Sequence, residues 1–271
     1  GMSCGQYLFS DTVRGRGGAH AYARDEAERN GAIMKEGYWV IRTYEAGAVG
    51  EKTKFWVEGQ RPPRSAKRLK TEAKKALANE YSAVKHLARL INANFRKGDI
   101  LLGLDYSDEG IEKLIKSIAG YADMEEAERL NALRNAAERE LKLCLRRVKY
   151  ALDKEGGEVK YIAVTSDMDG ETGEVVRIHH HLVINREALK AFEGKWTLGK
   201  VAHSRLSGQK DYTPVAEYLM AQVRKIPDAK KYTPSRNLIH PQPKDRIVKN
   251  GSQLRPPKGA VILHCAEWKP G

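Results

Sequence analysis

The stretch that decides the fold reads Arg177-Ile178-His179-His180-His181-Leu182-Val183-Ile184-Asn185. Side chains alternate between the two faces of a strand. In an extended segment over residues 175–185, His179 and His181 therefore share one face while His180 points away. The apolar run that follows supplies the β-strand propensity. Two imidazoles one pleat apart can hold one divalent cation together, although a histidine-rich strand of this kind is also compatible with a purely structural role.

The composition predicts a polyanionic partner. The 271 residues include 48 Lys and Arg against 35 Asp and Glu, a net charge of +13, which indicates nucleic acid most often, although anionic lipid would also fit. No apolar run approaches membrane-spanning length and no signal-peptide pattern is found, so we expect no membrane segment. Cys4, Cys144 and Cys265 form no Cys-x-x-Cys pair, which favours a reducing cytoplasm over a disulfide framework.

The N-terminal part predicts a loose arm, a hairpin and a basic helix. Residues 1–36 are rich in Gly, Arg and Ala and are expected to form a loose basic arm. Residues 37–95 contain two strands, over 38–44 and 54–57, and a helix over 65–94. Eleven Lys or Arg stand against two Glu between Arg61 and Lys97. We expect this run to contact nucleic acid rather than to be only a solvated helix face, through Lys67, Arg68, Lys74 and Lys75.

The central part predicts an α+β domain. Strands are expected over 99–106, 160–165, 175–185 and 200–206, and helices over 125–152, 186–193 and from Thr213 onward, with Thr213 as N-cap and Pro214 at the first helical position. The order β-α-β-β-α-β predicts a ferredoxin-like, split βαβ antiparallel sheet with helices on one face. Residues 241–271 are expected to form a basic, proline-containing tail.

These segments resemble the HUH endonucleases, specifically the rolling-circle replication initiators (Rep proteins) of bacterial plasmids, phages and mobile elements. The resemblance covers roughly residues 90–240, and we expect the nuclease domain over 96–240. Its motifs are the strand Leu101–Tyr106 with its lead-in Asn94–Asp99, the pair His179 and His181, the helix Ala216–Gln222 carrying Tyr218, and the segment Tyr232–Leu238 with Arg236 as a DNA contact. His180 departs from the hydrophobic residue usual between the two histidines.

The resemblance implies a metal-dependent nicking and joining reaction on single-stranded DNA. His179 and His181 would hold Mg²⁺ or Mn²⁺. Imidazole is a softer ligand than Mg²⁺ prefers, so a carboxylate should complete the site. Asp167 and Asp169 are expected in that role, with Asp105 as a further candidate.

Tyr218 would attack phosphorus, remain joined to the 5′ phosphate and leave a 3′ hydroxyl for a polymerase. A phenol has a pKa of about 10 and needs assistance. Many relatives carry a Lys one turn after the Tyr, where this chain has Ala221 and Gln222, so Lys225 is the expected substitute. Tyr212 is the reserve nucleophile.

Two alternatives remain at this stage. Transposases and conjugative relaxases of the HUH type share the His-x-His and the Tyr, although relaxases tend to place the Tyr before the histidines. A non-catalytic basic nucleic-acid-binding protein is the second alternative, favoured by the missing Lys and the uncertain third ligand. No Gly-x-x-x-x-Gly-Lys-Ser/Thr loop is found, so a host helicase is expected to unwind origin DNA in the bacterial cytoplasm.

Overall fold

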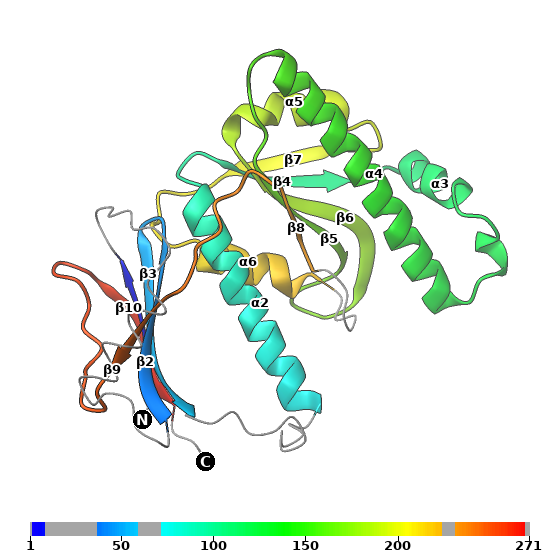
Figure 1. Ribbon diagram of the computed structural model, residues 1–271. Coiled ribbons are helices and arrows are strands. Elements are labelled where there is room, and N and C mark those ends of the chain that lie inside the picture. The colour runs from blue at the N-terminus through cyan, green and yellow to red at the C-terminus, as the bar shows by residue number, and fades with distance from the viewer. Residues whose placement is uncertain (1, 9–36, 59–71, 224–230, 269–271) are drawn as a thin grey trace. The chain divides into compact units, whose positions relative to one another are not determined.

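The computed structural model describes residues 2–8, 37–58, 72–223 and 231–268, in two compact units (Figure 1). The first unit combines the described residues of Gly1–Ala93 with those of His240–Gly271, and the second comprises those of Asn94–Ile239. No helix within the described ranges combines the length and the apolar character that crossing a membrane requires. The chain is therefore an α+β protein whose second unit is inserted between the two parts of the first.

The second unit is built on a five-stranded antiparallel sheet in the order β7-β4-β6-β5-β8. The strands are β4 (Ile100–Asp105), β5 (Tyr161–Met168), β6 (Val175–Ile184), β7 (Val201–Arg205) and β8 (Thr233–Pro234). Because β6 is antiparallel to both β4 and β5, those two strands run in the same direction with β6 between them. The helices are α3 (Asp108–Lys116), α4 (Glu126–Lys154), α5 (Leu189–Lys195) and α6 (Thr213–Ala221), with short 3₁₀ turns at Tyr121–Asp123 and Arg186–Ala188.

One face of this sheet forms the main core with α3, α4 and α5. The apolar stripe of α4 meets alternate residues of β4 and β6, and the core residues include Leu102, Leu104, Leu141, Val148, Leu182 and Phe192. Leu182 is fully buried, so its truncation to Ala is expected to cost about 2–5 kcal/mol. Side chains recur on one face about every 3.6 residues in a helix and every 2 residues in a strand. The apolar residues of α4 and of the strands follow these two spacings, so they meet in one core.

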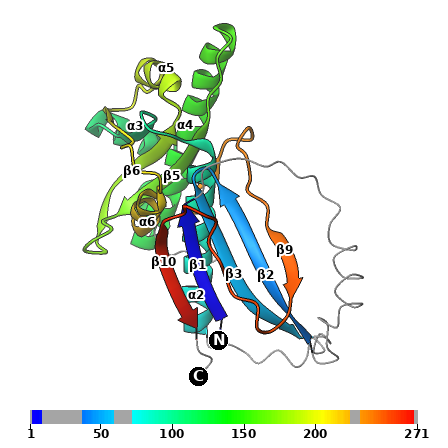
Figure 2. The same ribbon diagram turned by 90° about the vertical axis from the view of Figure 1, so that its left-hand side faces the viewer.

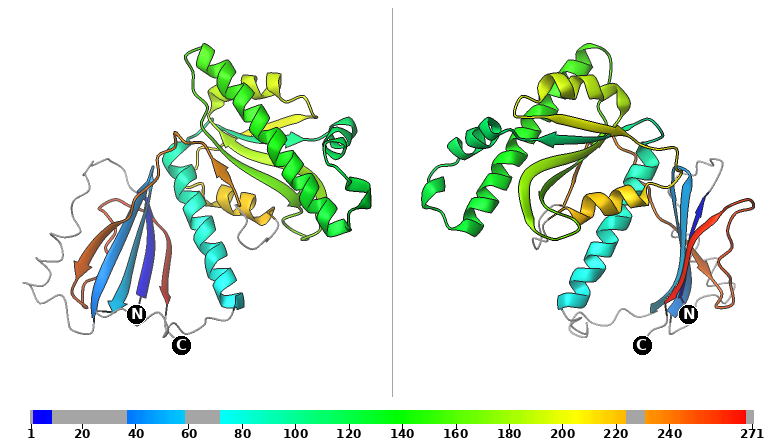
Figure 3. Two further views of the ribbon diagram at one scale, coloured as in Figure 1. Left: turned by 45° about the vertical axis from the view of Figure 1, so that its right-hand side comes forward. Right: turned by 180° about the vertical axis from the view of Figure 1, so that it is seen from behind.

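Helix α6 covers the opposite face of the same sheet. In the two ribbon views of Figure 3, α6 and α4 lie on opposite faces of this sheet. Tyr218 of α6 contacts His181, which is not part of the core shared with α4. The expectation that all helices lie on one face therefore holds for α3 to α5 but not for α6. The N-cap of α6 is Tyr212 rather than Thr213, and Pro214 lies in the first turn. The Asp211 carboxylate accepts hydrogen bonds from the main-chain N–H and the hydroxyl of Thr213.

The first unit is a second antiparallel sheet, in the order β10-β1-β3-β2-β9, together with helix α2 (Glu72–Asn94) (Figure 2). Its strands are β1 (Met2–Leu8), β2 (Gly37–Ala46), β3 (Val49–Glu58), β9 (Lys244–Val248) and β10 (Ile262–Trp268). Part of the expected arm thus forms β1, and the expected tail supplies β9 and β10. Arg42 of β2 makes a bidentate ion pair with Asp245 of β9, at 2.7 and 2.6 Å.

The hairpin between β2 and β3 turns at Gly47, a position that requires glycine. Its φ is +59°, and a Cβ there would lie 2.1 Å from the carbonyl oxygen of Asn92 at the end of α2. Arg89 of α2 binds Glu51 of β3 at 2.6 Å and stacks on the Tyr44 ring at 3.6 Å. The helix is thereby attached to the sheet of its own unit.

Candidate functional site

Strand β6 presents His179 and His181 on the face covered by α6. Their Nε2 atoms lie 3.0 Å apart and their rings meet edge to face at 4.7 Å. His179 Nδ1 is 2.8 Å from the carbonyl oxygen of Arg177. A carbonyl can only accept, so Nδ1 carries a proton, and Nε2 is the nitrogen that faces His181. Two ligand-type nitrogens therefore converge on one point.

His180 lies on the opposite face and is fully buried. Its Nε2 is 2.9 Å from the hydroxyl of Tyr106 and its Nδ1 is 3.1 Å from the hydroxyl of Thr165. Tyr106 also donates to the carbonyl oxygen of Ala137 at 3.3 Å. One assignment satisfies all three contacts: Thr165 donates to Nδ1 and Nε2–H donates to Tyr106. His180 is thus part of the core and cannot reach the His179–His181 face.

The geometry of the two nitrogens suits a divalent cation. Two ligands at about 2.1 Å and at right angles around an octahedral ion lie about 3.0 Å apart, which matches the observed 3.0 Å. Burial, and secondly the charge of His179, lowers the pKa of His181 to about 4. The imidazole of His181 is therefore neutral at pH 7, the protonation state that metal binding needs.

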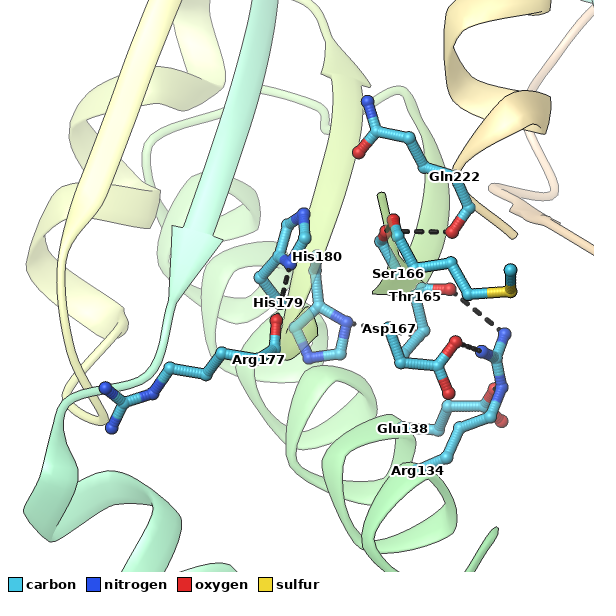
Figure 4. Close-up of polar contacts among 10 residues, drawn as sticks. Arg134, Glu138, Thr165, Ser166, Asp167, Arg177, His179, His180 and Gln222 are labelled. Atoms are coloured by element: carbon cyan, nitrogen blue, oxygen red, sulfur yellow. Dashed lines mark hydrogen bonds and ion pairs between the residues drawn. The ribbon is translucent and has the colours of Figure 1, made fainter. Parts of the chain in front are cut away.

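Gln222 supplies an oxygen at the same point. Its Oε1 accepts a hydrogen bond from His181 Nε2–H at 2.6 Å, so cation binding would need the tautomer of His181 that carries its proton on Nδ1. Gln222 also caps the C-terminus of α6. Ser166 of β5, fully buried, donates from Oγ to the Gln222 main-chain carbonyl oxygen at 2.8 Å (Figure 4). Amide oxygen is an acceptable ligand for hard cations. Two imidazoles and one amide could therefore hold a metal, while no cluster of three His, Cys, Asp or Glu occurs in the described ranges.

The sequence interpretation considered Gln222 only as a position where relatives carry Lys. A usable signal was present, because Gln222 follows Tyr218 by four residues and the two share one helix face. Tyr218 is 45% exposed, and its ring centroid lies 5.4 Å from that of His181. The phenol and the amide thus reach the histidine pair from adjacent turns of one helix.

These groups line one open cavity of about 710 Å³. Its lining includes His179, His181, Tyr218, Gln222, Asp105 and Asp169. Asp105 stands directly opposite His179 in the β4–β6 register, and its charge raises the pKa of His181 in opposition to the burial effect. The cavity is large enough for a nucleotide-sized group.

The two acids expected as metal ligands have different positions. Asp167 is 4% exposed and binds Arg134 of α4 at 3.0 Å, so it faces away from the histidine pair (Figure 4). Asp169 does line the cavity, but its Oδ1 accepts two main-chain hydrogen bonds at 2.8 Å, from Glu171 and Thr172. Those bonds lower the pKa of Asp169. Through them, Asp169 stabilises the turn between β5 and β6.

The remaining expected residues lie elsewhere. Tyr212 is buried, with its hydroxyl donating to the Ser207 carbonyl oxygen at 3.0 Å, and does not line the cavity. Arg236 is exposed beside β8. Lys225, Lys67 and Arg68 fall outside the described residues, as do the side chains of Lys74 and Lys75 in the first turns of α2.

Comparison of the chain with protein-family models, curated proteins and solved structures gives no match. The function is therefore inferred from the chemistry of the cavity itself.

Proposed function

We propose that this chain is an HUH-type DNA-nicking and strand-joining enzyme that initiates rolling-circle replication at an origin. The observation that carries the proposal is the convergence of Tyr218, Gln222, His179 and His181 on one cavity. A tyrosine in a helix is usually a packing residue. Here its hydroxyl-bearing ring is exposed beside two imidazoles suited to a cation, an arrangement that packing does not require.

The fold gives further support. The order β7-β4-β6-β5, with β6 between two strands that run in the same direction, supports a split βαβ arrangement of the ferredoxin-like type. The HUH resemblance places its histidine pair on a strand of such a sheet and its tyrosine on a following helix. We therefore assign the second unit to a ferredoxin-like HUH nuclease domain.

The chemistry requires bond exchange at one phosphorus. The Tyr218 oxygen forms a bond to the scissile phosphorus as the bond to the 3′ oxygen breaks, and the product is a phosphotyrosine at the 5′ side. The phenol loses a proton and the departing oxygen gains one. One phosphodiester replaces another and no water is consumed, so reversal rejoins a strand without ATP.

The side chains of the cavity have distinct parts in this reaction. Mg²⁺ or Mn²⁺ bound by His179, His181 and Gln222 would supply Lewis-acid polarisation of a non-bridging phosphate oxygen. His181 stays neutral to act as a ligand, and Asp105 adds negative charge that favours a cation. Lys225 is proposed to assist the Tyr218 phenol.

The partners follow from the charge and from this chemistry. We propose that Lys67, Arg68, Lys74, Lys75 and Arg236 contact single-stranded or origin DNA through phosphates. A host helicase would unwind the duplex and a host polymerase would extend the 3′ hydroxyl, in the bacterial cytoplasm. A plasmid, a phage or another mobile element would carry such an initiator.

A covalent-trapping assay tests the proposal. End-labelled single strands from a random pool are incubated with the full chain and Mn²⁺, and denaturing gels detect a slower protein–DNA band whose DNA is then sequenced. We expect the band with the native chain and its loss in the His179→Ala/His181→Ala variant. Cleavage without a band would indicate a hydrolytic metal nuclease. Binding without cleavage would indicate a non-catalytic DNA-binding protein.

A further inference from the structure

A second cavity, of about 780 Å³, lies between the C-terminal half of α4 and the β5–β8 edge. Its residues belong entirely to the second unit, and its floor includes Leu145 and Val159, which are part of the core shared by the sheet and α4. It therefore opens on the side of the sheet that packs against α4, opposite the face that carries His179 and His181. The proposed nicking chemistry does not use it.

The rim of this groove carries uncompensated positive charge. Lys142, Arg146 and Lys149 stand on one face of α4, and Arg236 faces them from beyond β8. Both acids at the rim are already paired, Asp153 with Lys149 and Glu158 with Lys160. Among the residues that the structure describes, no carboxylate binds Lys142, Arg146 or Arg236. A groove with several unpaired cations attracts a ligand with several anionic groups.

The floor of the groove is apolar and its far wall is held in place. Leu145 and Val159 are each 6% exposed, and Tyr161 lies beside them with its ring half-buried. Ser235 binds Tyr161 in both directions, accepting from its main-chain N–H at 3.1 Å and donating its own N–H at 2.8 Å. Asn237 donates to the Val159 carbonyl oxygen at 3.2 Å. The segment that carries Arg236 is thus tied to β5 on both sides.

We infer that this groove binds the backbone of single-stranded nucleic acid, as a second contact separate from the nicking cavity. Arg146 and Arg236 offer planar donor sets that match phosphate oxygens. The spacing from Lys142 to Lys149 covers about 10.5 Å of helix, longer than one phosphate group. The apolar floor with Tyr161 offers a surface for a base or sugar. The inference rests on the proposed function, because the strand held here would belong to the substrate that is nicked on the other face.

Binding of a fluorescent oligothymidine of about 12 nucleotides tests the inference, with full-length chain in EDTA so that no cleavage occurs. The test variant is Arg146→Gln/Arg236→Gln. The matched control is Arg139→Gln/Arg147→Gln, which removes the same charge from exposed positions of α4 that do not line the groove. Affinity is measured by anisotropy across a salt series, and circular dichroism verifies that each variant is folded.

We expect the affinity of the test variant for the oligothymidine to be at least roughly fivefold lower than that of the control variant. Its log–log salt slope should be shallower by about 1.4, or about 0.7 for each phosphate that is no longer neutralised. Equal weakening in both variants would show that only net charge matters and would overturn the inference. Competition by thymidine monophosphate as strong as that by the oligonucleotide would also overturn it, in favour of a mononucleotide site.

The same variants separate this inference from the proposed function. If the test variant binds DNA more weakly than the control while the native chain forms no covalent adduct, the groove inference is supported and the proposed function is refuted. If the native chain forms the adduct and the test variant binds DNA as tightly as the control, the proposed function is supported and the groove inference is refuted.

Discussion

Ser166 donates a hydrogen bond from its Oγ to the main-chain carbonyl oxygen of Gln222 across 2.8 Å. Ser166 stands opposite His179 in the β5–β6 register, and Gln222 ends the helix that carries Tyr218. One buried hydroxyl thus fixes the end of the tyrosine helix to the strand beside the histidines. The position of the Gln222 amide depends on this contact.

Ser166→Ala is expected to weaken Mn²⁺ binding severalfold, because the end of α6 loses its attachment to the sheet, and to lower the free energy of unfolding by about 1 kcal/mol. Isothermal titration with Mn²⁺ and urea unfolding measure the two effects. Ser235→Ala is the matched control: it removes another buried serine hydroxyl of the same unit and should lower stability without changing Mn²⁺ affinity. Equal Mn²⁺ affinities in the two variants would refute a positioning role for Ser166.

Gln222→Ala is expected to lower Mn²⁺ affinity on the order of tenfold, because one of the three ligand atoms is removed. Gln222→Glu should raise the affinity, since a carboxylate adds the negative charge that a hard cation prefers. Asp167→Asn should leave Mn²⁺ affinity unchanged, because Asp167 faces Arg134 on the other side of the sheet. A loss of affinity in the Asp167 variant without unfolding would restore that residue as a ligand.

Tyr218→Phe is expected to abolish the covalent protein–DNA adduct while leaving the helix folded, because only the attacking oxygen is removed. Tyr212→Phe should retain the adduct, since the Tyr212 hydroxyl is bound to the Ser207 carbonyl oxygen outside the cavity. Denaturing gels of reactions with Mn²⁺ compare the two variants. The opposite pattern would make Tyr212 the nucleophile.

The stability of the metal-free protein is expected to depend on His180 at acidic pH. Burial lowers the pKa of His180 to about 3, below its ordinary value of about 6.5. As the pH falls below about 6.5 the unfolded chain binds a proton that the folded chain does not, so the free energy of unfolding declines until about pH 3. The contribution is present above pH 6.5 and is lost progressively across this window.

Replacing His180 by Gln should therefore flatten the pH dependence of unfolding between pH 4 and 6 by up to about 1.4 kcal/mol per pH unit. Urea unfolding in EDTA at several pH values measures this slope. Ser235→Ala serves as the control, because it removes a buried polar side chain of the same unit that does not titrate, and should keep the native slope. An unchanged slope in the His180 variant would mean that the buried ring does not titrate on unfolding.

The sequence predicts the local elements of the second unit well, because their periodicities are strong. The α+β class, the strands β4 to β7 and the helices α4 to α6 follow from alternation in the strands and from the apolar stripe of α4, whereas α3 (Asp108–Lys116) and β8 (Thr233–Pro234) were not predicted. The strands β9 and β10 were missed, since their stability comes from partners far away in the chain: Arg42 and Asp245 are 203 residues apart. β9 is a short basic segment that carries little local sign of such pairing, whereas the apolar residues of β10 favour a strand and were not used.

The candidate site was predictable in part. The shared face of His179 and His181 follows from the pleat alone. The position of Asp167 depends in addition on the pairing register: Ser166 pairs with His179, so Asp167, like Thr165, points to the other face, and a sequence without the register does not say which residue of β5 shares the face of His179. Gln222 was not predicted as a metal ligand because the family resemblance implies a Lys at this position. Its spacing of four residues from Tyr218 nevertheless places both side chains on one helix face.

The pairing of β1 with β10 and of β2 with β9 has a consequence for the order of folding during synthesis. Residues 94–239 are contiguous, so the second unit can close its core while the last strands are still inside the ribosome. The first unit cannot complete its sheet until Lys244–Val248 and Ile262–Trp268 have emerged. Until then its two outer strand edges stay unpaired and open to pairing with other chains. Strands β1 and β2 are thus made long before β9 and β10, the two strands that cover their edges.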